Sequence, residues 1–273
     1  MKVYNLSFLL LICFFVSCSS NNVTQDDSLK KYFDSANVRG CFGIFDNISG
    51  QFTIYNISEF KDSARVPGNS FDLVNALIGI QTGKIGAKEL PAYWDSNKSF
   101  TNSWDSAAKY LANPTSLPDQ QVHHDWTEEL ATRIGKATMQ HWLDSLGYGQ
   151  RYGKFKIGDN LNRFWTDNSL RITADEQMGL VKNLYFDKLP FYKTTQGALK
   201  PLLIKEDNSN YKLAYKSAIA TDPGKQAIGW TFGWVEENRH PYFFVLETVG
   251  GSGDQIPLLK KVLTHMGFFQ GKK

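Results

Sequence analysis

The sequence predicts an α+β domain, in which strands from both ends of the chain form one antiparallel sheet and a helical region is inserted between them. Three observations support this fold class. Short β-type runs occur at residues 40–57 and again at 211–248, apolar residues recur at helical spacing between them, and a further apolar helix follows the last strand. Strands at both ends with helices between and after them are typical of such a sheet.

The first run predicts a β-hairpin that is followed by a core helix. Residues 40–45 and 51–57 are β-type and flank the polar turn 46–50, which is the pattern of a hairpin. Residues 69–83 then place apolar side chains at helical spacing. This predicted helix ends at Gly83, because glycine can take the left-handed conformation that follows a helix.

Apolar stripes predict further helices in the middle of the chain. The stripes are Trp126, Leu130 and Ile134, and then Met139, Trp142, Leu143 and Leu146. A later helix is predicted to begin at a capping box formed by Thr173 and Glu176. The last third predicts strands over 211–215, 228–235 and 242–248, a polar turn over 236–241, and a terminal helix with Leu258, Leu259, Val262, Leu263 and Met266.

Composition places the chain among ordinary globular proteins. Of its 273 residues 42% are hydrophobic and 21% are charged, and this length can bury a core without a metal or a disulfide. The 30 Lys and Arg and 27 Asp and Glu residues are scattered, which argues against nucleic acid as a partner. The sequence contains no repeat, no membrane-spanning run after its first residues and no glycine-rich phosphate loop.

The first residues predict an export signal and a lipid anchor. Lys2 precedes the apolar run 6–16, which is too short to span a bilayer, so residues 1–17 are predicted to be a signal peptide. Residues 15–18 resemble a bacterial lipobox without its usual first Leu, so Cys18 is predicted to be lipidated. Residues 18–36 are then a polar tether and residues 37–273 a single domain.

This anchor places the protein in the bacterial cell envelope, facing the periplasm or the surface, with the membrane as a partner. An ordinary secretory signal with an incidental cysteine is the alternative interpretation. Cys41 would be the only cysteine of the folded part, so no intramolecular disulfide is expected.

Three segments resemble motifs of the class D, oxacillinase-type β-lactamases. Residues 67–78 resemble the family's helix that begins Pro-x-Ser-x-Phe-Lys, residues 147–150 resemble its Tyr-Gly-Asn turn, and residues 164–173 resemble its Phe-Trp segment. The chain is identified by this resemblance as a divergent member of the class D β-lactamase and penicillin-binding transpeptidase-like family. The resemblance implies that fold and, where the site is intact, hydrolysis of β-lactams.

The resemblance places Asn69 and Asp72 at the family's nucleophile and base positions. It implies a serine and, three residues later, a carbamylated lysine that takes the serine's proton. An amide is no acyl acceptor, and a carboxylate cannot be carbamylated. Ser70 is the alternative nucleophile, but it lies about 100° around the helix from that face. Its own i+3 residue is Leu73, which is not a base.

The other motif positions also depart from the family. A weaker alignment of the second motif puts Leu111 at the place of a proton-relaying serine. The third motif, Lys-Thr-Gly, corresponds to Lys216, Ser217 and Ala218, and the alanine replaces a glycine against which a ligand can lie. No arginine occurs in 247–254, where many class D enzymes bind the substrate carboxylate. Trp165 is kept and is expected to pack in the core.

Neither a metal nor a cofactor is expected. The side chains of the adjacent residues His123 and His124 are expected to diverge, and no Cys or His lies at ligand spacing nearby. Glu128 and Glu129 are expected to form a solvated helix face.

These observations predict a catalytically inactive pseudoenzyme with a binding or structural role in the envelope. Its expected binding region is the former cleft around Ser70, Lys216 and Ser217, and its expected partner is a peptidoglycan fragment, a β-lactam or an envelope protein. The alternative is an active serine β-lactamase, or a penicillin-acylated protein, that uses Ser70 or another serine.

The replacement of a lysine by Asp72 makes a further prediction. In the family arrangement the first-motif and third-motif lysines both face the cleft, so Asp72 is predicted to form an ion pair with Lys216 that closes the cleft floor. The competing interpretation is that Asp72 completes a helix cap with Asn69 while Lys216 reaches solvent.

Overall fold

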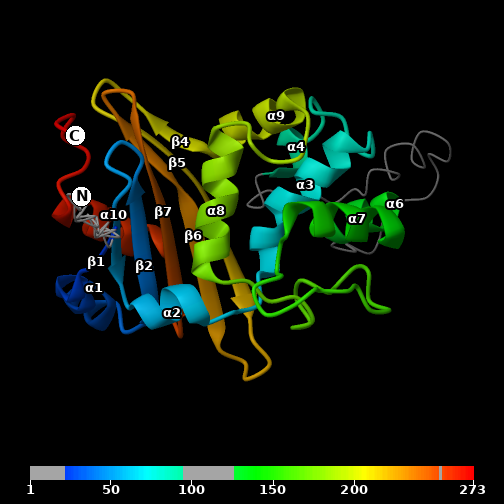
Figure 1. The fold of residues 1–273 in the computed structure, drawn as a ribbon, viewed down its shortest axis with the longest axis horizontal. Coiled ribbons are helices and arrows are strands. Elements are labelled where there is room, and N and C mark those ends of the chain that lie inside the picture. Colours follow the sequence, from blue (N-terminus) through cyan, green and yellow to red (C-terminus); the bar gives the residue numbers. More distant parts are fainter. Residues whose placement is uncertain (1–21, 95–125, 252–253) are drawn as a thin grey trace, which may run out of the picture.

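A seven-stranded sheet runs through the molecule in the order β1-β3-β2-β7-β6-β5-β4 (Figure 1). The computed structural model describes residues 22–94, 126–251 and 254–273. The strands are β1 (Val23–Gln25), β2 (Arg39–Asp46), β3 (Phe52–Tyr55), β4 (Ile204–Asp207), β5 (Lys212–Thr221), β6 (Ala227–Glu237) and β7 (His240–Val249). The predicted combination of N-terminal and C-terminal strands in one sheet is confirmed, because β2 pairs with β7 along its whole length.

The sheet is mixed rather than wholly antiparallel, which corrects the prediction at one edge. Strand β1 pairs parallel with β3, with Val23 opposite Phe52, whereas the other neighbours pair antiparallel. A parallel neighbour needs a long crossover connection. Here the segment from Asp26 to Gln51, which contains α1 and the whole of β2, supplies it.

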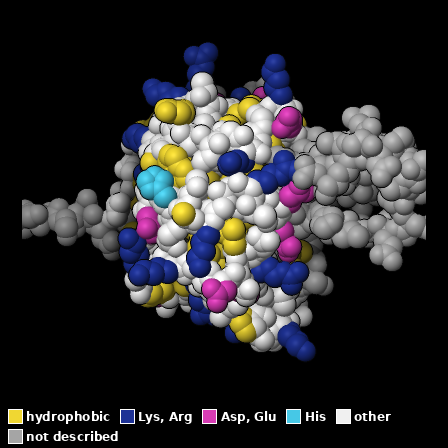
Figure 2. Space-filling model, turned by 90° about the vertical axis from the view of Figure 1, so that its right-hand side faces the viewer, with side chains coloured by type: hydrophobic (Ala, Val, Ile, Leu, Met, Phe, Trp, Pro, Cys, Tyr) yellow, Lys and Arg dark blue, Asp and Glu magenta, His cyan; other side chains and the backbone are white. Residues whose placement is uncertain are grey.

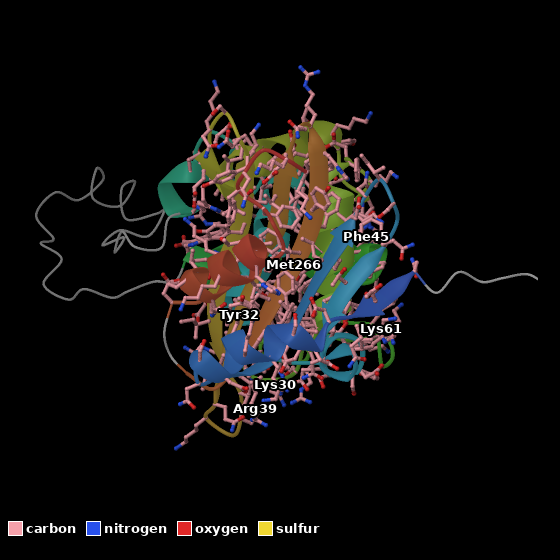
Figure 3. All side chains as sticks on the ribbon, turned by 90° about the vertical axis from the view of Figure 1, so that its left-hand side faces the viewer. Lys30, Tyr32, Arg39, Phe45, Lys61 and Met266 are labelled. Carbon is pink, nitrogen blue, oxygen red and sulfur yellow. The ribbon has the colours of Figure 1, made fainter. Side chains whose placement is uncertain are left out.

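The central strands are buried on both faces, so their sequences are nearly continuous apolar runs. Along β2, Cys41 and Phe45 belong to one core cluster, whereas Phe42 and Ile44 belong to a second one on the opposite face. The second cluster is covered by helices α1 (Lys30–Ser35) and α10 (Ile256–His265), as Figures 1 and 3 show.

The N-terminal residues from 22 onwards are part of the fold, and this corrects the tether predicted over 18–36. Strand β1 is followed by a 3₁₀ turn, η1 (Asp27–Leu29), and by α1, and the side chains of Leu29 and Phe33 are buried. A polar segment was expected to lack core contacts, but these two apolar residues are enough to bind it to the sheet. The predicted signal peptide and Cys18 lie outside the described residues.

The inserted region is helical, as predicted. Its elements are α2 (Ile57–Asp62), η2 (Gly68–Phe71), α3 (Asp72–Gln81), α4 (Pro91–Trp94), α6 (Trp126–Ile134), α7 (Lys136–Leu146), α8 (Ala174–Tyr185) and α9 (Lys193–Leu203). Helices α2 and α8 lie on the sheet face of the larger core cluster, whereas α3, α4, α6 and α7 extend away from that face (Figure 1). None of the helices in the described ranges is long and apolar enough to cross a membrane.

The turn between β6 and β7 is shorter than the predicted 236–241. The strands continue to Glu237 and resume at His240, so that Asn238 and Arg239 form a two-residue turn with φ angles of 50° and 65°. Two positive φ values are what a tight hairpin turn of the favoured twist requires. The polar residues on either side are therefore strand residues.

Surface charge is dispersed on the helical side of the molecule. On the face shown in Figure 2, lysine and arginine side chains are separated by uncharged and acidic ones. Within the described part of the chain, Glu129 pairs with Arg133 at 2.6 Å and Glu128 with Arg163 at 3.5 Å. The Glu128 side chain is 38% exposed and that of Glu129 only 19%, so the expected solvated face holds for Glu128 and not for Glu129.

Candidate functional site

The former cleft lies where the start of α3 approaches strand β5. Gly68 has a φ of +52°, and a Cβ atom there would come within 2.8 Å of the Ala220 Cα atom. Only glycine allows this approach of η2 to the strand. It brings Asn69 and Asp72 from one segment next to Lys216 and Ser217 from the other.

A buried ion pair joins Asp72 to Lys216, and the prediction of this pair is confirmed. The Lys216 Nζ atom donates to Asp72 Oδ2 at 2.7 Å, and both side chains are buried. Thr127 on α6 donates to Asp72 Oδ1 at 3.0 Å. The Lys216 ammonium also lies 4.9 Å from the ring centroid of Trp94. Such additional contacts are what a desolvated ion pair requires to be stable.

The competing cap interpretation is wrong. Helix α3 has Phe71 at its N-cap, without any side-chain cap hydrogen bond, and its preceding turn η2 is continuous with it. The Asp72 carboxylate therefore points to the sheet instead of back to Asn69. The Asn69 side chain is exposed at the mouth of the cleft.

Ser70 faces the protein interior. It is 0% exposed, and its Oγ atom accepts a hydrogen bond of 2.9 Å from Gln177 on α8. The rotation predicted from helix geometry is thus confirmed. Tyr148 is also buried in this region, and burial raises the pKa of its phenol far above the usual value. A neutral phenol and an amide surround Ser70, and neither is a base.

The cleft itself is a cavity of about 270 Å³. Its lining residues are Asn69, Lys216, Ser217, Ala218, Ile219, Asp254 and Gln255. The hydroxyl groups of Ser217 and Thr231 lie 3.1 Å apart, and Thr231 donates to Gln255 Oε1 at 2.8 Å. Ser217 is therefore the serine that faces the cleft, and its hydroxyl group lies beside that of Thr231.

Sequence reasoning missed Asp254 and Gln255. They follow β7: Asp254 ends the segment 247–254, in which an arginine was expected from the family, and Gln255 is the next residue. The Gln255 amide lies across β6, where a Cβ atom on Gly229 would be 1.9 Å from its Nε2. A glycine in the middle of a strand signals such a close approach. Gly229 was therefore the feature of the sequence that could have indicated the close approach of Gln255.

Trp165 is a core residue, as expected. Its ring is 1% exposed and stacks on Phe71 with centroids 4.9 Å apart and an interplanar angle of 19°. Phe164 packs edge-on against it at 4.9 Å. This aromatic group anchors η2 against the segment before α8.

Leu111, His123 and His124 lie outside the described ranges. Across residues 22–94, 126–251 and 254–273 there is no group of three His, Cys, Asp or Glu side chains that could hold a metal ion.

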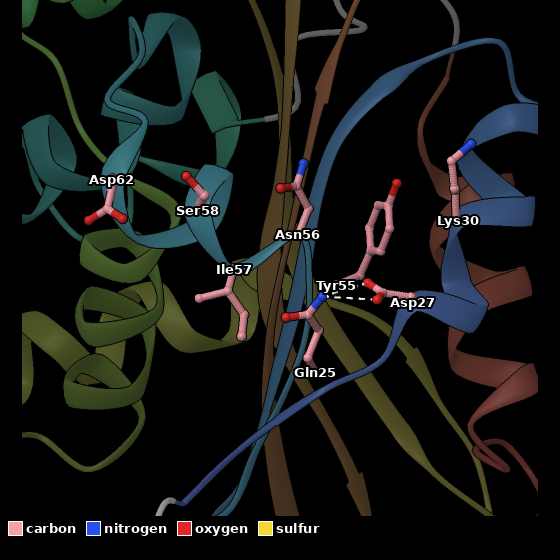
Figure 4. Close-up of a pocket in the computed structure, with 8 residues that line it drawn as sticks. All are labelled: Gln25, Asp27, Lys30, Tyr55, Asn56, Ile57, Ser58 and Asp62. Carbon is pink, nitrogen blue, oxygen red and sulfur yellow. Dashed lines mark hydrogen bonds between the residues drawn. The ribbon is translucent and has the colours of Figure 1, made fainter.

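A larger depression of about 600 Å³ lies between η1, β3 and α2. Figure 4 shows Gln25, Asp27 and Lys30 on one side of it and Ile57, Ser58 and Asp62 on the other. Gln25 donates to both carboxylate oxygens of Asp27 at 2.9 Å. None of the predicted site residues lines this depression.

A second buried ion pair was not predicted. Glu247 on β7 is fully buried and accepts a hydrogen bond of 2.8 Å from Arg65 Nε, while Arg65 also contacts Glu59. Burial raises the pKa of Glu247 to about 7, although Arg65 acts in the opposite direction. Cys41, directly opposite Glu247 on β2, is buried as a free thiol.

Comparison with known proteins assigns the chain to a family. Residues 40–261 match the family model of the penicillin-binding protein transpeptidase domain. The chain belongs to this family. Among its relatives, β-lactamase OXA-5 of Pseudomonas aeruginosa is 26% identical over 268 residues, which cover 97% of this chain and 96% of that one. β-Lactamase OXA-20 of the same species is 29% identical over 222 residues, which cover 79% and 76%.

The solved structures agree with this transpeptidase-domain assignment. The crystal structure of FUS-1 (OXA-85), a class D β-lactamase from Fusobacterium nucleatum subsp. polymorphum, matches with a TM-score of 0.71 at 26% identity. The match covers 90% of this chain and all of that one. The predicted β-lactamase and transpeptidase-like fold is confirmed.

Proposed function

We propose that this class D β-lactamase-like protein is a catalytically inactive pseudoenzyme of the bacterial cell envelope. It is held at the membrane by a lipid on Cys18 and has a binding or structural role. The Asp72–Lys216 ion pair is the observation that carries the proposal. By resemblance, the family has a lysine at each of the two positions, 72 and 216, that this ion pair joins.

Acyl transfer requires a nucleophile with a base beside it. Asn69 is the residue at the cleft mouth, and its amide cannot form an acyl-enzyme. Asp72 is engaged by Lys216 and Thr127. Lys216 donates to the Asp72 carboxylate in the cleft floor, so its ammonium group is bonded within the protein.

The two serines near the cleft do not favour the active alternative. Ser70 is buried beside Gln177, out of contact with the cavity. Ser217 faces the cavity, and its nearest hydroxyl partner, Thr231, is itself bonded to Gln255. Neither arrangement supplies the base that activates a hydroxyl.

Intact-mass measurement after incubation with a fluorescent penicillin tests this proposal. We expect no penicilloyl adduct and no turnover of a chromogenic cephalosporin. The Ser70→Ala and Ser217→Ala variants serve as matched controls and should give the same spectra as the unchanged chain. A mass increase of one penicillin that either substitution abolishes would establish the enzyme interpretation.

The open cleft supports a binding role. Its polar lining from Asn69, Ser217 and Asp254 suits a ligand that is held without a covalent bond, and we propose a peptidoglycan fragment, a β-lactam or a segment of an envelope protein. Isothermal titration with muropeptides and with penicillin tests the first two. Binding that is lost on Asn69→Leu but kept on Lys84→Gln, at an exposed position after α3 that does not line the cleft, would assign the ligand to the cleft.

A further inference from the structure

The point at which the chain enters the fold is fixed at one corner of the sheet. Asn22 accepts a hydrogen bond of 2.7 Å from the Phe52 backbone and donates through its side chain to the Gly50 carbonyl at 3.1 Å. Strand β1 then pairs with β3 from its first residue. Residue 22 is thereby held beside the β2–β3 turn, which includes Ile48.

A lipid on Cys18 would leave a very short connection to this corner. Four residue steps separate Cys18 from Asn22, and a fully extended chain of that length spans at most about 14 Å. A domain of this size has a radius of gyration of about 18 Å. The connection is shorter than that radius, so an anchored domain cannot turn its far side to the bilayer. This step rests on the lipid anchor of the proposed function.

The same corner gathers two hairpin turns and the C-terminus. His240 Nε2 lies 3.3 Å from the Ile48 backbone nitrogen, which joins the β2–β3 turn to the β6–β7 turn. Asn238 donates to the carbonyls of Gly271 and Lys273, at 3.2 and 2.7 Å. Figure 1 shows these turns at the upper end of the sheet and the β5–β6 turn at the lower end. In Figure 3, Phe45 marks the upper end of β2 and Arg39 the lower end.

We call this set Ile48, Arg239, Lys272 and Lys273 the docking corner. Ile48 is 76% exposed at the tip of its turn, which is unusual for so apolar a side chain. Arg239, Lys272 and Lys273 are also exposed. An exposed apolar tip beside several cations is the combination that binds the interface of an anionic bilayer.

The acidic groups at this corner are already engaged. The Glu237 carboxylate is buried and accepts hydrogen bonds from the backbone N–H groups of Phe269, Lys272 and Lys273. Asp46 lies 2.8 Å from His240. The side chains of Arg239, Lys272 and Lys273 have no carboxylate within 4.0 Å in the part of the chain that is described. Positive charge at the corner is thus available to an external anion.

We propose that the docking corner lies on an anionic phospholipid surface, with Ile48 inserted among the headgroups and the three cations against the phosphates. The short connection holds the corner at the bilayer, and the charges fix its orientation. The former cleft is built from other residues, around β5 and the start of α3, and stays outside this contact.

Hydrogen exchange on an anchored chain tests the orientation. The chain beginning at Cys18 is coupled through that thiol to a maleimide phospholipid, either in phosphatidylcholine vesicles or in vesicles that also contain phosphatidylglycerol. Cys41 is buried and does not compete for the reagent. On anionic vesicles we expect amides of the β2–β3 and β6–β7 turns to exchange about fivefold more slowly, whereas the β5–β6 turn keeps its rate.

A matched pair of triple variants identifies the cause. Replacing the three corner cations, Arg239→Gln, Lys272→Gln and Lys273→Gln, should abolish the protection. The control has the same change of charge at exposed lysines elsewhere, Lys84→Gln, Lys88→Gln and Lys225→Gln, and should keep it.

The proposal would be overturned if anionic lipid slowed amide exchange to the same extent at all three turns or at none of them. It would also be overturned if both triple variants lost the protection equally. The anchor here is attached chemically. This experiment therefore gives the same result whether or not Cys18 is lipidated in the cell. A failure of the proposed orientation can thus be told apart from a failure of the proposed lipid anchor.

Discussion

At the scale of single residues, the two oxygens of Asp72 bond to different elements. Oδ1 accepts from Thr127 on α6, and Oδ2 accepts from Lys216 on β5. The carboxylate thus connects the helical region to the sheet at the point where the family, by resemblance, carries out chemistry. A buried pair of this kind becomes costly when one partner is removed, because the other charge stays desolvated.

A double-mutant cycle on Asp72→Asn and Lys216→Met measures this coupling. Each single change should lower the free energy of unfolding by about 3–5 kcal/mol, because it leaves a buried charge without its partner. The double variant should be less destabilised than the sum, by about 0.5–3 kcal/mol. Chemical denaturation provides the measurement.

The exposed pair Lys30–Asp34 is the control for this cycle, since its side chains are 63% and 60% exposed. Its coupling should be below about 0.5 kcal/mol. Additive effects of Asp72→Asn and Lys216→Met would contradict the role assigned to the buried pair.

The raised pKa of Glu247 leads us to expect a specific dependence of the free energy of unfolding on pH. Its folded pKa of about 7 lies above the ordinary value of 4.5, so the folded state keeps a proton that the unfolded chain has already released. The free energy of unfolding should therefore fall as the pH rises from about 4.5 to 7, by at most about 3 kcal/mol. Denaturation curves of the unchanged chain and of Glu247→Gln, measured across this window, should diverge.

The exposed Glu89→Gln variant is the matched control and should follow the unchanged chain at every pH. Parallel curves for Glu247→Gln would mean that Arg65 keeps the buried carboxylate ionised throughout.

At the scale of elements, helix α8 shows how a local signal specifies a boundary. The Thr173 hydroxyl accepts from the Glu176 backbone, and the Glu176 carboxylate accepts in return from the Thr173 backbone. This capping box was predicted from two residues alone. We expect Thr173→Ala to lower the free energy of unfolding by about 1–2 kcal/mol. The control Thr264→Ala, at an exposed position inside α10, should leave stability nearly unchanged, and an equal loss in both would contradict the cap's contribution.

Elements without such local signals were not predicted. Helix α9 contains Pro201, which argues against a helix interior because proline has no N–H to donate to the carbonyl four residues earlier. Strand β4 is short and bulged at the sheet edge. Strand β1 has only three residues, too few for a pattern of alternation to predict it, and it pairs with the edge that β3 offers.

At the scale of the whole molecule, the lipid anchor at Cys18 predicts membrane fractionation. The mature protein should be recovered with membranes of a bacterial host. The Cys18→Ala variant should be released or should remain as an uncleaved precursor, because the modified residue is missing. Fractionation and intact mass provide the measurement. A Cys18→Ala variant that is processed and fractionates like the unchanged chain would make the ordinary secretory signal the correct interpretation.

The sequence by itself determined the class of fold, the order of the main elements and the orientation of Ser70. These follow from periodicity, caps and helix geometry, which act over a few neighbouring residues. It also indicated the Asp72–Lys216 pair, because motif positions known from resemblance specified which residues would meet across the cleft.

The tertiary structure alone decided where the N-terminal segment lies, how Gln255 crosses the cleft and how Arg65 reaches Glu247. Each of these depends on residues that are far apart in the chain, and their meeting is set by the packing of the whole sheet. The position of residue 22 at a charged corner belongs to this group. The sequence of the first residues cannot by itself indicate that β3 has a free edge with which they can pair.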